Sequence, residues 1–387
     1  MNAAASHTQP LPLEPGATLG VLGGGQLGRM FAVEALRMGY FVVVLDPDPQ
    51  SPAGLIATRH LQAAFDDRDA LAEMAAQCDA ITIEFENIPA DSVRYLGETT
   101  RVTPSAACIE VAQDRETEKQ FATRAGLKTA PYGVIKQRSD IDAACRVAGF
   151  PCILKTSRLG YDGKGQVVCH AVAEVEAAFE SVGSVPCVLE QRIDLAMEIS
   201  VVLCRSDNGT TTAFPVAENR HVNGILDVSM APASADESLQ QLAVDSAVKL
   251  SEALEYVGVM AVEFFISADG ELLVNEMAPR PHNSGHFTLD ATETSQFEQQ
   301  VRMLCGLPAA SCRLLTPVVM LNLLGDRWQN GEPAWSSLYA KPEARLHLYA
   351  KAAARAGRKM GHVNFLSHSR DSAMTLAQTV SDQLSGQ

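Results

Sequence analysis

The chain has 387 residues, of which 47% are hydrophobic and 20% are charged, and its formal net charge is −15 at pH 7. This length exceeds one ordinary core and indicates two or three domains with the composition of a globular protein. An acidic chain lacks the basic face that nucleic-acid binding requires, and no apolar run approaches the length of a membrane span. We therefore expect neither a nucleic acid nor a membrane as a partner.

Residues 1–16 contain Pro10, Pro12 and Pro15 and indicate a flexible tail. They hold no basic segment followed by an apolar one, so a secretory signal is not expected. The nine cysteines show neither Cys-x-x-Cys nor Cys/His spacing, which gives no support for zinc. Thiols in a chain without a signal fit a reducing compartment, and we expect a cytoplasmic location.

Residues 17–115 alternate strands and helices. The predicted elements are a strand at 18–22, a glycine turn at 23–28, a helix at 29–38, and strands at 41–45 and 80–83. Such alternation predicts a parallel sheet with helices on both faces, that is, a Rossmann-like α/β domain.

Residues 116–310 alternate less regularly and predict an α+β domain. The expected helices are at 116–123, 141–148 and 236–254, and the expected strands at 152–155, 167–169, 187–190, 199–203, 259–266 and 272–276. A small β-rich domain follows over 311–387, with strands near 318–323 and 345–349.

The segment Gly23–Gly28 matches Gly-x-Gly-x-x-Gly between a predicted strand and a predicted helix, and Asp46 ends the next strand. This pattern is the dinucleotide-binding fingerprint in its usual context. The alternative is a tight strand-to-helix turn in which glycines permit close packing and anion binding at the helix end. The motif leaves both interpretations open, and the rest of the chain lowers the case for a dinucleotide.

A predicted hairpin brings two carboxylates together. With a four-residue loop at 268–271, Ser267 opposes Leu272 and Glu263 opposes Glu276. Two carboxylates directly across paired strands repel each other, and apolar neighbours make the site half-buried.

The pair Glu263 and Glu276 therefore needs a compensating cation. Oxygen ligands favour Mg²⁺, held by two carboxylates and substrate phosphates, and the amide oxygen of Asn275 is adjacent. The alternative is a shifted register that turns both carboxylates toward solvent.

Two further segments suit phosphate binding. Lys155 ends a buried strand, and residues 160–166, Gly-Tyr-Asp-Gly-Lys-Gly-Gln, combine three glycines with a central lysine. The segment is not a Walker A motif, because Gly-Lys is not followed by Ser or Thr. The ordinary alternatives are a solvated lysine and a flexible surface loop.

Residues 280–286, Arg-Pro-His-Asn-Ser-Gly-His, follow the carboxylate hairpin directly and favour a substrate loop over a simple polar turn. Lys351 and the pair Arg358–Lys359 lie far along the chain, and by themselves they indicate a solvated basic patch.

Taken together, these segments resemble the ATP-grasp superfamily, and within it the family of 5-(carboxyamino)imidazole ribonucleotide synthases. The resemblance runs from about residue 18 to about residue 366. Its carrying segments are Gly23–Met30, Glu84–Asn87, Asp114–Arg115, Gly160–Gln166, Gly258–Glu263, Asn275–His286 and Gly357–His362. The Tyr-Asp-Gly-Lys-Gly-Gln and Pro-Arg-x-His-Asn-Ser-Gly-His stretches are specific, whereas an isolated Gly-x-Gly-x-x-Gly is not.

The resemblance implies an ATP-grasp fold with a Rossmann-like pre-domain and a small C-terminal β-rich domain. It also implies a carbon–nitrogen ligase of purine biosynthesis, on the route to IMP, that uses ATP and Mg²⁺. Bicarbonate would attack the γ-phosphate to give carboxyphosphate, and 5-aminoimidazole ribonucleotide would take the carboxyl group, directly or through released CO₂. The family further suggests a homodimer.

By motif, the resemblance implies a role for each of the following residues. Those implied to bind ATP are Arg115, Lys155, Gly160, Tyr161, Asp162, Gly163, Lys164, Gly165, Gln166, Glu190, Gln191, Arg192, Ile193, Glu198, His221, Asn275 and Glu276. Those implied to face the ribonucleotide are Gly25, Gln26, Leu27, Glu84, Asn87, Lys351 and Arg358. The implied catalytic residues are Arg280, His282 and Asn283, and the implied Mg²⁺ ligands are Glu263 and Glu276.

Two positions depart from the family pattern. Lys164 stands where some relatives carry Arg, and Ala356–Gly357 replaces a more usual Pro-Gly beside Arg358. Lys164 and Arg would each supply positive charge to residues 160–166, the glycine-rich lid. The absence of the proline leaves open how rigid the loop beside Arg358 is.

Competing interpretations are a formate-using or biotin-carboxylase-like ATP-grasp ligase and an NAD-binding regulatory Rossmann module. Formate-using relatives carry a serine-rich segment where Tyr161–Asp162 stand, and biotin carboxylases are longer with a four-glycine lid. An NAD-binding module would not account for Glu263, Glu276 and the lid.

Overall fold

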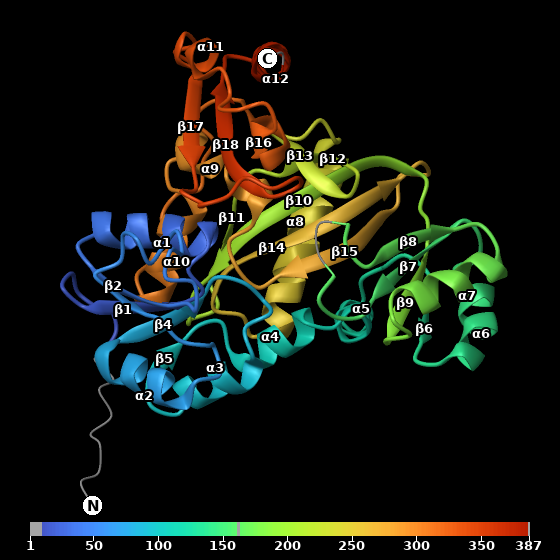
Figure 1. The fold of residues 1–387 in the computed structure, drawn as a ribbon, viewed down its shortest axis with the longest axis horizontal. Coiled ribbons are helices and arrows are strands. Elements are labelled where there is room, and N and C mark those ends of the chain that lie inside the picture. The colour runs from blue at the N-terminus through green and yellow to red at the C-terminus, as the bar shows by residue number, and fades with distance from the viewer. Residues whose placement is uncertain (1–9, 161–162, 386–387) are drawn as a thin grey trace, which may run out of the picture.

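The computed structural model describes residues 10–160 and 163–385. Figure 1 shows a parallel sheet near the N-terminus, a long central sheet, and a small sheet at the opposite side of the molecule. The first nine residues of the predicted tail, together with Tyr161 and Asp162 of the lid, lie outside the described residues. Leu13, within the segment assigned to the tail, is buried and donates its N–H to the carbonyl of Cys305.

The N-terminal sheet has the order β3-β2-β1-β4-β5, and all its strands are parallel. Its strands are β1 (Thr18–Leu22), β2 (Phe41–Leu45), β3 (Arg59–Leu61), β4 (Ala80–Ile83) and β5 (Arg101–Val102). Helices α1 (Gln26–Arg37) and α10 (Gln296–Leu304) pack on one face. Helices α2 (Arg68–Gln77), α3 (Ala90–Gly97) and α4 (Ala106–Ala112) cover the other. The predicted parallel sheet with helices on both faces is confirmed.

The predicted start of the first helix, Arg29, is wrong, because α1 already begins at Gln26 with Gly25 as its N-cap. The turn is therefore only Gly23–Gly25 long. Gly23 has φ +100°, and a Cβ there would lie 2.8 Å from the side chain of Glu84. Both the conformation and the close approach require glycine.

The central sheet has nine strands in the order β15-β14-β10-β12-β13-β16-β18-β17, with β11 beside β10. These are β10 (Leu195–Arg205), β11 (Thr211–Ala213), β12 (Ala217–Val222), β13 (Ile225–Ala231), β14 (Gly258–Ser267), β15 (Leu272–Ala278), β16 (Val318–Leu324), β17 (Ala344–Leu348) and β18 (Lys359–Leu366). Because β16 pairs with β13, the C-terminal strands extend the central sheet instead of forming one of their own.

Helices pack against different parts of this sheet. Helix α8 (Glu237–Ala253) packs on β10 and β14, and α12 (Arg370–Ser385) packs on β16 and β18. Three shorter helices are α5 (Arg115–Arg124), α9 (Thr288–Ala291) and α11 (Trp335–Tyr339). Within the described part of the chain, every helix is too short or too polar to bridge a lipid bilayer.

The small sheet has the order β6-β9-β7-β8, built from β6 (Tyr132–Ile135), β7 (Cys152–Thr156), β8 (Gln166–Cys169) and β9 (Cys187–Gln191). Helices α6 (Ile141–Ala148) and α7 (Val172–Ser181) close its core. The glycine-rich lid segment joins β7 to β8, so this sheet carries the lid on its edge.

The β14–β15 hairpin confirms the opposition of Glu263 and Glu276, but by a different register from the predicted one. Leu272 pairs with Ile266 and not with Ser267, so the predicted four-residue turn is wrong. A β-bulge beside Glu263 then restores the pairing of Glu263 with Glu276. Sequence spacing alone does not report such a bulge, because it depends on the partner strand.

The bulge has a consequence for side-chain direction. In a regular strand, Asn275 and Glu276 would point to opposite faces. At the bulge, both side chains line the same cavity. The amide oxygen and the carboxylate are thereby offered to one ligand.

Helix α10 ties the N-terminal sheet to the central sheet through Gln300, which is 1% exposed. Its amide nitrogen donates to Thr82 Oγ1 of β4 at 2.7 Å, and its amide oxygen accepts from the N–H of Val259 of β14 at 2.7 Å. One buried side chain therefore satisfies polar groups of two different sheets.

Replacing Gln300 by Met should lower the free energy of unfolding by about 1–3 kcal/mol, since Val259 N–H and the Thr82 hydroxyl lose their buried partner. Denaturant unfolding of the purified variant measures this change. Gln241→Met is the control, because the exposed Gln241 side chain donates to Asp245 one turn further along α8. The control should change stability by less than about 0.5 kcal/mol, and an equal loss in both variants would contradict the role given to Gln300.

Candidate active site

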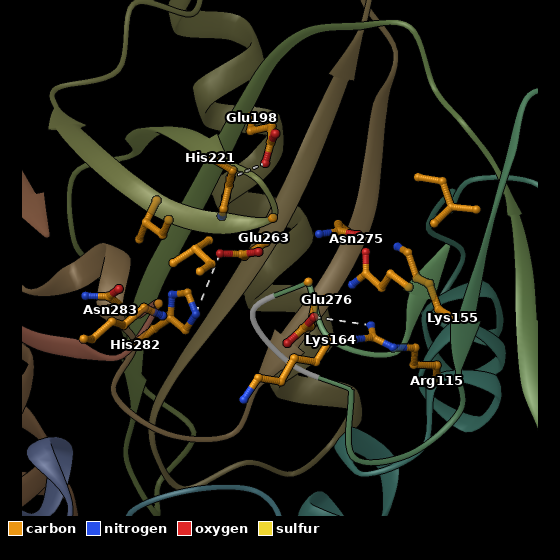
Figure 2. Close-up of a pocket in the computed structure, with 18 of the residues that line it drawn as sticks. Arg115, Lys155, Lys164, Glu198, His221, Glu263, Asn275, Glu276, His282 and Asn283 are labelled. Atoms are coloured by element: carbon orange, nitrogen blue, oxygen red, sulfur yellow. Dashed lines mark hydrogen bonds and ion pairs between the residues drawn. The ribbon is translucent and has the colours of Figure 1, made fainter. Parts of the chain in front are cut away.

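A cavity of about 1320 Å³ opens between the three sheets. Figure 2 shows Glu263 and Glu276 at its centre, Arg115 and Lys155 on one side, and His282 and Asn283 on the other. The cavity is large enough for a nucleotide and a second small substrate together.

Most of the residues predicted for the site line this cavity. They are Gln26, Leu27, Glu84, Asn87, Arg115, Lys155, Gly163, Lys164, Gln166, Glu190, Gln191, Arg192, Ile193, Glu198, His221, Glu263, Asn275, Glu276, Arg280, His282, Asn283, Lys351 and Arg358. Gly25, Gly160 and Gly165 are adjacent to it in the chain and are not among its lining residues.

Several other residues line the cavity to which the sequence assigned no role in the site, although some of them lie in segments that it named. They include Phe85, Glu86, Asp194, Leu195, Gly224, Ile225, Leu226, Phe265, Arg355, Ala356, Gly357 and Lys359. Glu86 lay within a family-like segment and could have been found from it. The β12–β13 hairpin, which contributes Gly224–Leu226, gave no signal because its strands are short and partly polar.

The phosphate-facing side contains a buried group of charges. Glu190 accepts a hydrogen bond from Lys155 Nζ at 2.9 Å, and Lys119 Nζ lies 3.2 Å from its other oxygen. Burial disfavours the Glu190 carboxylate, but the charges of Lys155 and Lys119 outweigh it and lower its pKa to about 2. Lys155 is 6% exposed, so the interpretation of it as a solvated lysine is wrong.

Arg115, at the start of α5, links this group to the carboxylate centre. Its guanidinium donates to Glu276 Oε2 and to the carbonyl of Gly160, each at 3.3 Å. Burial opposes its charge, but Glu276, Glu118 and Glu190 raise its pKa further. Arg115 is thus a permanent cation between the lid and the carboxylates.

Glu263 and its neighbours form the carboxylate centre. Burial, reinforced by the charges of Glu276 and Glu198, raises the pKa of Glu263 to about 7. His221 Nδ1 lies 2.7 Å from Glu198 Oε2. Burial works against the charged form of His221, yet the contact with Glu198 and the charge of Glu263 raise its pKa.

This centre fits a hard divalent cation that takes its remaining ligands from a substrate. Within the described residues, no group of three or more His, Cys, Asp or Glu side chains could hold a metal by itself. Glu263 and Glu276 instead face each other with Asn275 beside them. Two carboxylates with open positions are the usual protein share of a Mg²⁺–nucleotide site.

The loop after β15 presents His282 to the carboxylates. His282 Nδ1 accepts from the N–H of Ser284 at 3.3 Å, so its ring proton sits on Nε2, which lies 3.7 Å from Glu263 Oε1. Burial, followed by the charges of Arg280 and Lys359, holds the pKa of His282 well below its ordinary value. The ring is therefore neutral and offers an N–H donor to the cavity.

Arg280 and Asn283 are fixed by partners from other elements. Arg280 Nε donates to Glu86 Oε2, which comes from the loop after β4. Asn283 Nδ2 donates to Asn322 Oδ1 at 3.0 Å, and Asn322 Nδ2 donates back at 2.8 Å. The side chains of this loop are thus oriented by both the N-terminal sheet and the central sheet.

Carboxylates occupy three backbone amides of the glycine turn and the start of α1. Gly24 N–H donates to Asp46 Oδ2 at 2.6 Å, Gly25 N–H donates to Glu84, and Leu27 N–H donates to Glu84 Oε1 at 3.2 Å. Burial raises the pKa of Glu84 to about 7. Because carboxylates occupy these three donors, they are not available to a pyrophosphate, which argues against the dinucleotide interpretation.

The loop 351–359 completes the basic side of the cavity. Lys351 Nζ donates to the carbonyl of Lys359 at 2.7 Å. Asp326 accepts from Gly357 N–H at 2.7 Å, and Gly325 N–H donates to the carbonyl of Arg358 at 2.8 Å. These hydrogen bonds restrain the loop beside Arg358, where the sequence lacks the proline of the family pattern.

Glu190→Gln should destabilise the protein by about 3–5 kcal/mol, because two buried lysines lose their counter-charge. The folded-state pKa of about 2 lies below the ordinary 4.5, so the stabilisation is complete above pH 4.5 and is lost as the pH falls toward 2. Denaturant unfolding across this pH window should show that the difference in the free energy of unfolding between wild type and variant becomes smaller as the pH falls.

Glu180→Gln is the matched control, since Glu180 pairs with Arg138 on the exposed surface of the same small sheet unit. The Glu180→Gln substitution should lower the free energy of unfolding by less than about 1 kcal/mol. A gap between Glu190→Gln and wild type that stays constant with pH would contradict the assignment.

Comparison with known proteins identifies the family. Family models match residues 16–113 as a ribonucleotide synthetase preATP-grasp domain, 120–297 as an ATP-grasp domain, and 318–375 as a phosphoribosylaminoimidazole carboxylase C-terminal domain. The N5-carboxyaminoimidazole ribonucleotide synthase of Bacillus subtilis is 46% identical over 357 residues, which cover 92% of this chain and 93% of that protein.

Solved structures agree with this relationship. A crystal structure of the ADP complex of an N5-carboxyaminoimidazole ribonucleotide synthetase is 42% identical, with a TM-score of 0.92 and coverage of 96% and 98% of the two chains. An Aspergillus clavatus N5-carboxyaminoimidazole synthase, in complex with ADP and 5-aminoimidazole ribonucleotide, is 28% identical with a TM-score of 0.87 and coverage of 95% and 98%. The chain therefore belongs to the N5-carboxyaminoimidazole ribonucleotide synthase family of ATP-grasp ligases.

Proposed function

We propose that the protein carboxylates 5-aminoimidazole ribonucleotide with bicarbonate at the expense of ATP, giving the N-carboxyamino ribonucleotide, ADP and phosphate in purine biosynthesis. The observation that carries the proposal is one cavity in which the Glu263–Glu276 pair lies between a cationic phosphate side and a neutral histidine. The names of the relatives, and the ribonucleotide in the Aspergillus complex, support the choice of substrate.

ATP would lie with its phosphates toward Arg115 and Lys155, under the lid. The lid residues of the proposal are Gly160, Tyr161, Asp162, Gly163, Lys164, Gly165 and Gln166. Arg115 is charged at any physiological pH, and Lys155 is held by Glu190 on a strand of the small sheet. The segment Glu190, Gln191, Arg192 and Ile193 would line the adenine. Glu198 would accept hydrogen bonds from the ribose hydroxyls, and His221 would also contact the nucleotide.

Mg²⁺ would be held by Glu263 and Glu276, with Asn275 assisting through its amide oxygen, and by the phosphates. Bound there, it would neutralise charge on the transferring phosphoryl group. The direct opposition of two half-buried carboxylates supports this assignment, because without a cation the pair is destabilising.

The ribonucleotide and bicarbonate would occupy the side of the cavity opposite Lys155. Gly25, Gln26, Leu27, Glu84 and Asn87 would bind the ribonucleotide from the N-terminal sheet, and Lys351 and Arg358 would bind it from the C-terminal loop. Arg280, His282 and Asn283 would contact the reacting groups. The rigid support of Arg280 by Glu86 and of Asn283 by Asn322 suits such a role.

In the proposed reaction a bicarbonate oxygen attacks the γ-phosphorus, and the bond to ADP breaks. The resulting carboxyphosphate then loses phosphate as the substrate amine, which gives up a proton, takes the carboxyl group directly or through CO₂. Arg115, Lys155 and Lys164 would stabilise the phosphoryl oxygens, and the neutral His282 Nε2–H would donate to a carboxyl or phosphate oxygen. Lid closure would exclude water from the short-lived intermediate.

Three further expectations extend the proposal: a homodimer, a cytoplasmic location, and a division of the chain into 1–16, 17–115, 116–310 and 311–387. The family membership and the three matched segments support them. Sedimentation equilibrium tests the first, cell fractionation the second, and limited proteolysis the third.

The direct test is ADP release by the purified protein with Mg-ATP, with bicarbonate and 5-aminoimidazole ribonucleotide added singly and together. We expect turnover that requires the ribonucleotide and rises with bicarbonate. ATP binding without stimulation by the ribonucleotide would overturn the proposal and direct the search to formate and other acceptors.

Glu276→Gln should abolish Mg²⁺-dependent turnover while leaving the fold intact, because the amide keeps the packing and loses the charge. We expect kcat to fall by about 10³-fold, of the order seen when a group that stabilises the transition state is removed. The ADP assay over a Mg²⁺ series measures this. Glu271→Gln, in the turn of the same hairpin and paired with Lys128 on the exposed surface, should behave as wild type. Unchanged turnover in Glu276→Gln would contradict the metal assignment.

A further inference from the structure

We infer that Gln296 is a positioning residue for His282, and this inference rests on the proposed function of the His282 loop. Gln296 is the first residue of α10 and is 0% exposed. It follows the N-cap Ser295, whose hydroxyl accepts from the N–H of Glu298 at 2.9 Å. A side chain at this first helical position extends back beyond the helix start, which is where the His282 loop lies.

The Gln296 amide binds the backbone of His282 on both sides. Its Oε1 accepts from His282 N–H at 2.9 Å, and its Nε2 donates to the carbonyl of His282 at 2.7 Å. This two-point contact imitates a paired strand and restrains both peptide planes that carry the imidazole. A rotation of either plane would move the ring relative to Glu263.

The orientation of the amide follows from its partners. His282 N–H can only donate, so the oxygen must face it, and Nε2 must then donate both to the His282 carbonyl and to His286 Nδ1 at 3.0 Å. His286 therefore carries its ring proton on Nε2. One side chain thus holds the loop at two places and selects the tautomer of a second, buried histidine.

The loop sequence is adapted to this contact. A Cβ on Gly285 would lie 2.7 Å from Gln296 Oε1 and 2.9 Å from its Cδ. Only glycine leaves room for the amide at this position. The N–H of Gln296 also donates to Thr288 Oγ1 at 3.0 Å, and that hydroxyl donates to the Gly285 carbonyl at 2.6 Å.

Helix α10 offers a matched control in Gln299, which is equally buried. Its amide nitrogen donates to Thr294 Oγ1 at 2.9 Å and to the Ala310 carbonyl at 2.7 Å, and its oxygen accepts from Ala310 N–H at 3.2 Å. Thr294 lies just before α10 and Ala310 lies in the segment after it, and neither residue lines the cavity. Gln296→Met and Gln299→Met therefore remove comparable buried hydrogen bonds from one helix, but only the first touches the His282 loop.

The experiment compares kcat and KM in the ribonucleotide-dependent ADP assay, together with thermal unfolding. Gln296→Met should lower kcat by about 10²-fold, because a small displacement of a reacting group is enough for such a loss. Its KM for Mg-ATP should stay within about twofold of wild type, because Arg115 and Lys155 lie on other elements. Gln299→Met should lose similar thermal stability and keep kcat within about twofold.

An unchanged kcat in Gln296→Met, or an equal fall in both variants, would overturn the inference. If Gln296→Met does not fold, Gly285→Ala displaces the same amide from the other side and should give the same fall in kcat at unchanged KM for ATP. Unchanged kinetics in Gly285→Ala would likewise overturn it.

Ring ¹⁵N shifts of the histidines separate this inference from the proposed function. In wild type, His286 Nδ1 should show the chemical shift of an unprotonated, hydrogen-bonded acceptor. This chemical shift should change in Gln296→Met and remain unchanged in Gln299→Met. If wild type shows no ribonucleotide-dependent turnover, the proposed function fails while this shift still decides whether Gln296 holds the loop. An identical His286 signal in all three proteins would refute the contact.

Discussion

The constraint on which the cavity depends is the direct opposition of Glu263 and Glu276 across two paired strands. Such a pair repels in a half-buried setting, and burial with the charges of Glu276 and Glu198 raises the pKa of Glu263 to about 7. Neighbouring groups compensate the negative charge of the pair: Arg115 contacts Glu276, and His282 directs its Nε2–H toward Glu263. The site is thus prepared for a cation and phosphates rather than for an apolar ligand.

Keeping charges in place inside a protein requires partners from several elements, because desolvation is costly unless the geometry is fixed. Glu190 balances two lysines from α5 and β7, and Glu86 from the N-terminal sheet orients Arg280. Every one of these pairs joins residues far apart in the chain. The three sheets must therefore be assembled before the electrostatics of the cavity exist.

Helix α10 makes that assembly rigid through buried amides. Gln300 connects the parallel sheet to β14, and Gln296 holds the His282 loop. A buried amide that satisfies donors and acceptors on both sides adds specificity of orientation, whereas an apolar side chain of the same size would fill only the space. The loop that presents His282, which contains a single 3-10 turn at Asn283–Gly285, is thereby held by contacts from α10.

Local patterns in the sequence determined the strands Thr18–Leu22, Phe41–Leu45 and Ala80–Ile83, the helix Ile141–Ala148, and the family motifs, because periodicity and caps act between near neighbours. The opposition of Glu263 and Glu276 was also predicted, although with Ser267 opposite Leu272, whereas in the structure Leu272 pairs with Ile266. Only the tertiary structure decided the bulge that turns Asn275 into the cavity, the occupation of the glycine-turn amides by Glu84 and Asp46, and the joining of β16 to β13. These features are contacts between distant segments, so they depend on how the sheets pack and leave no local signal in the chain.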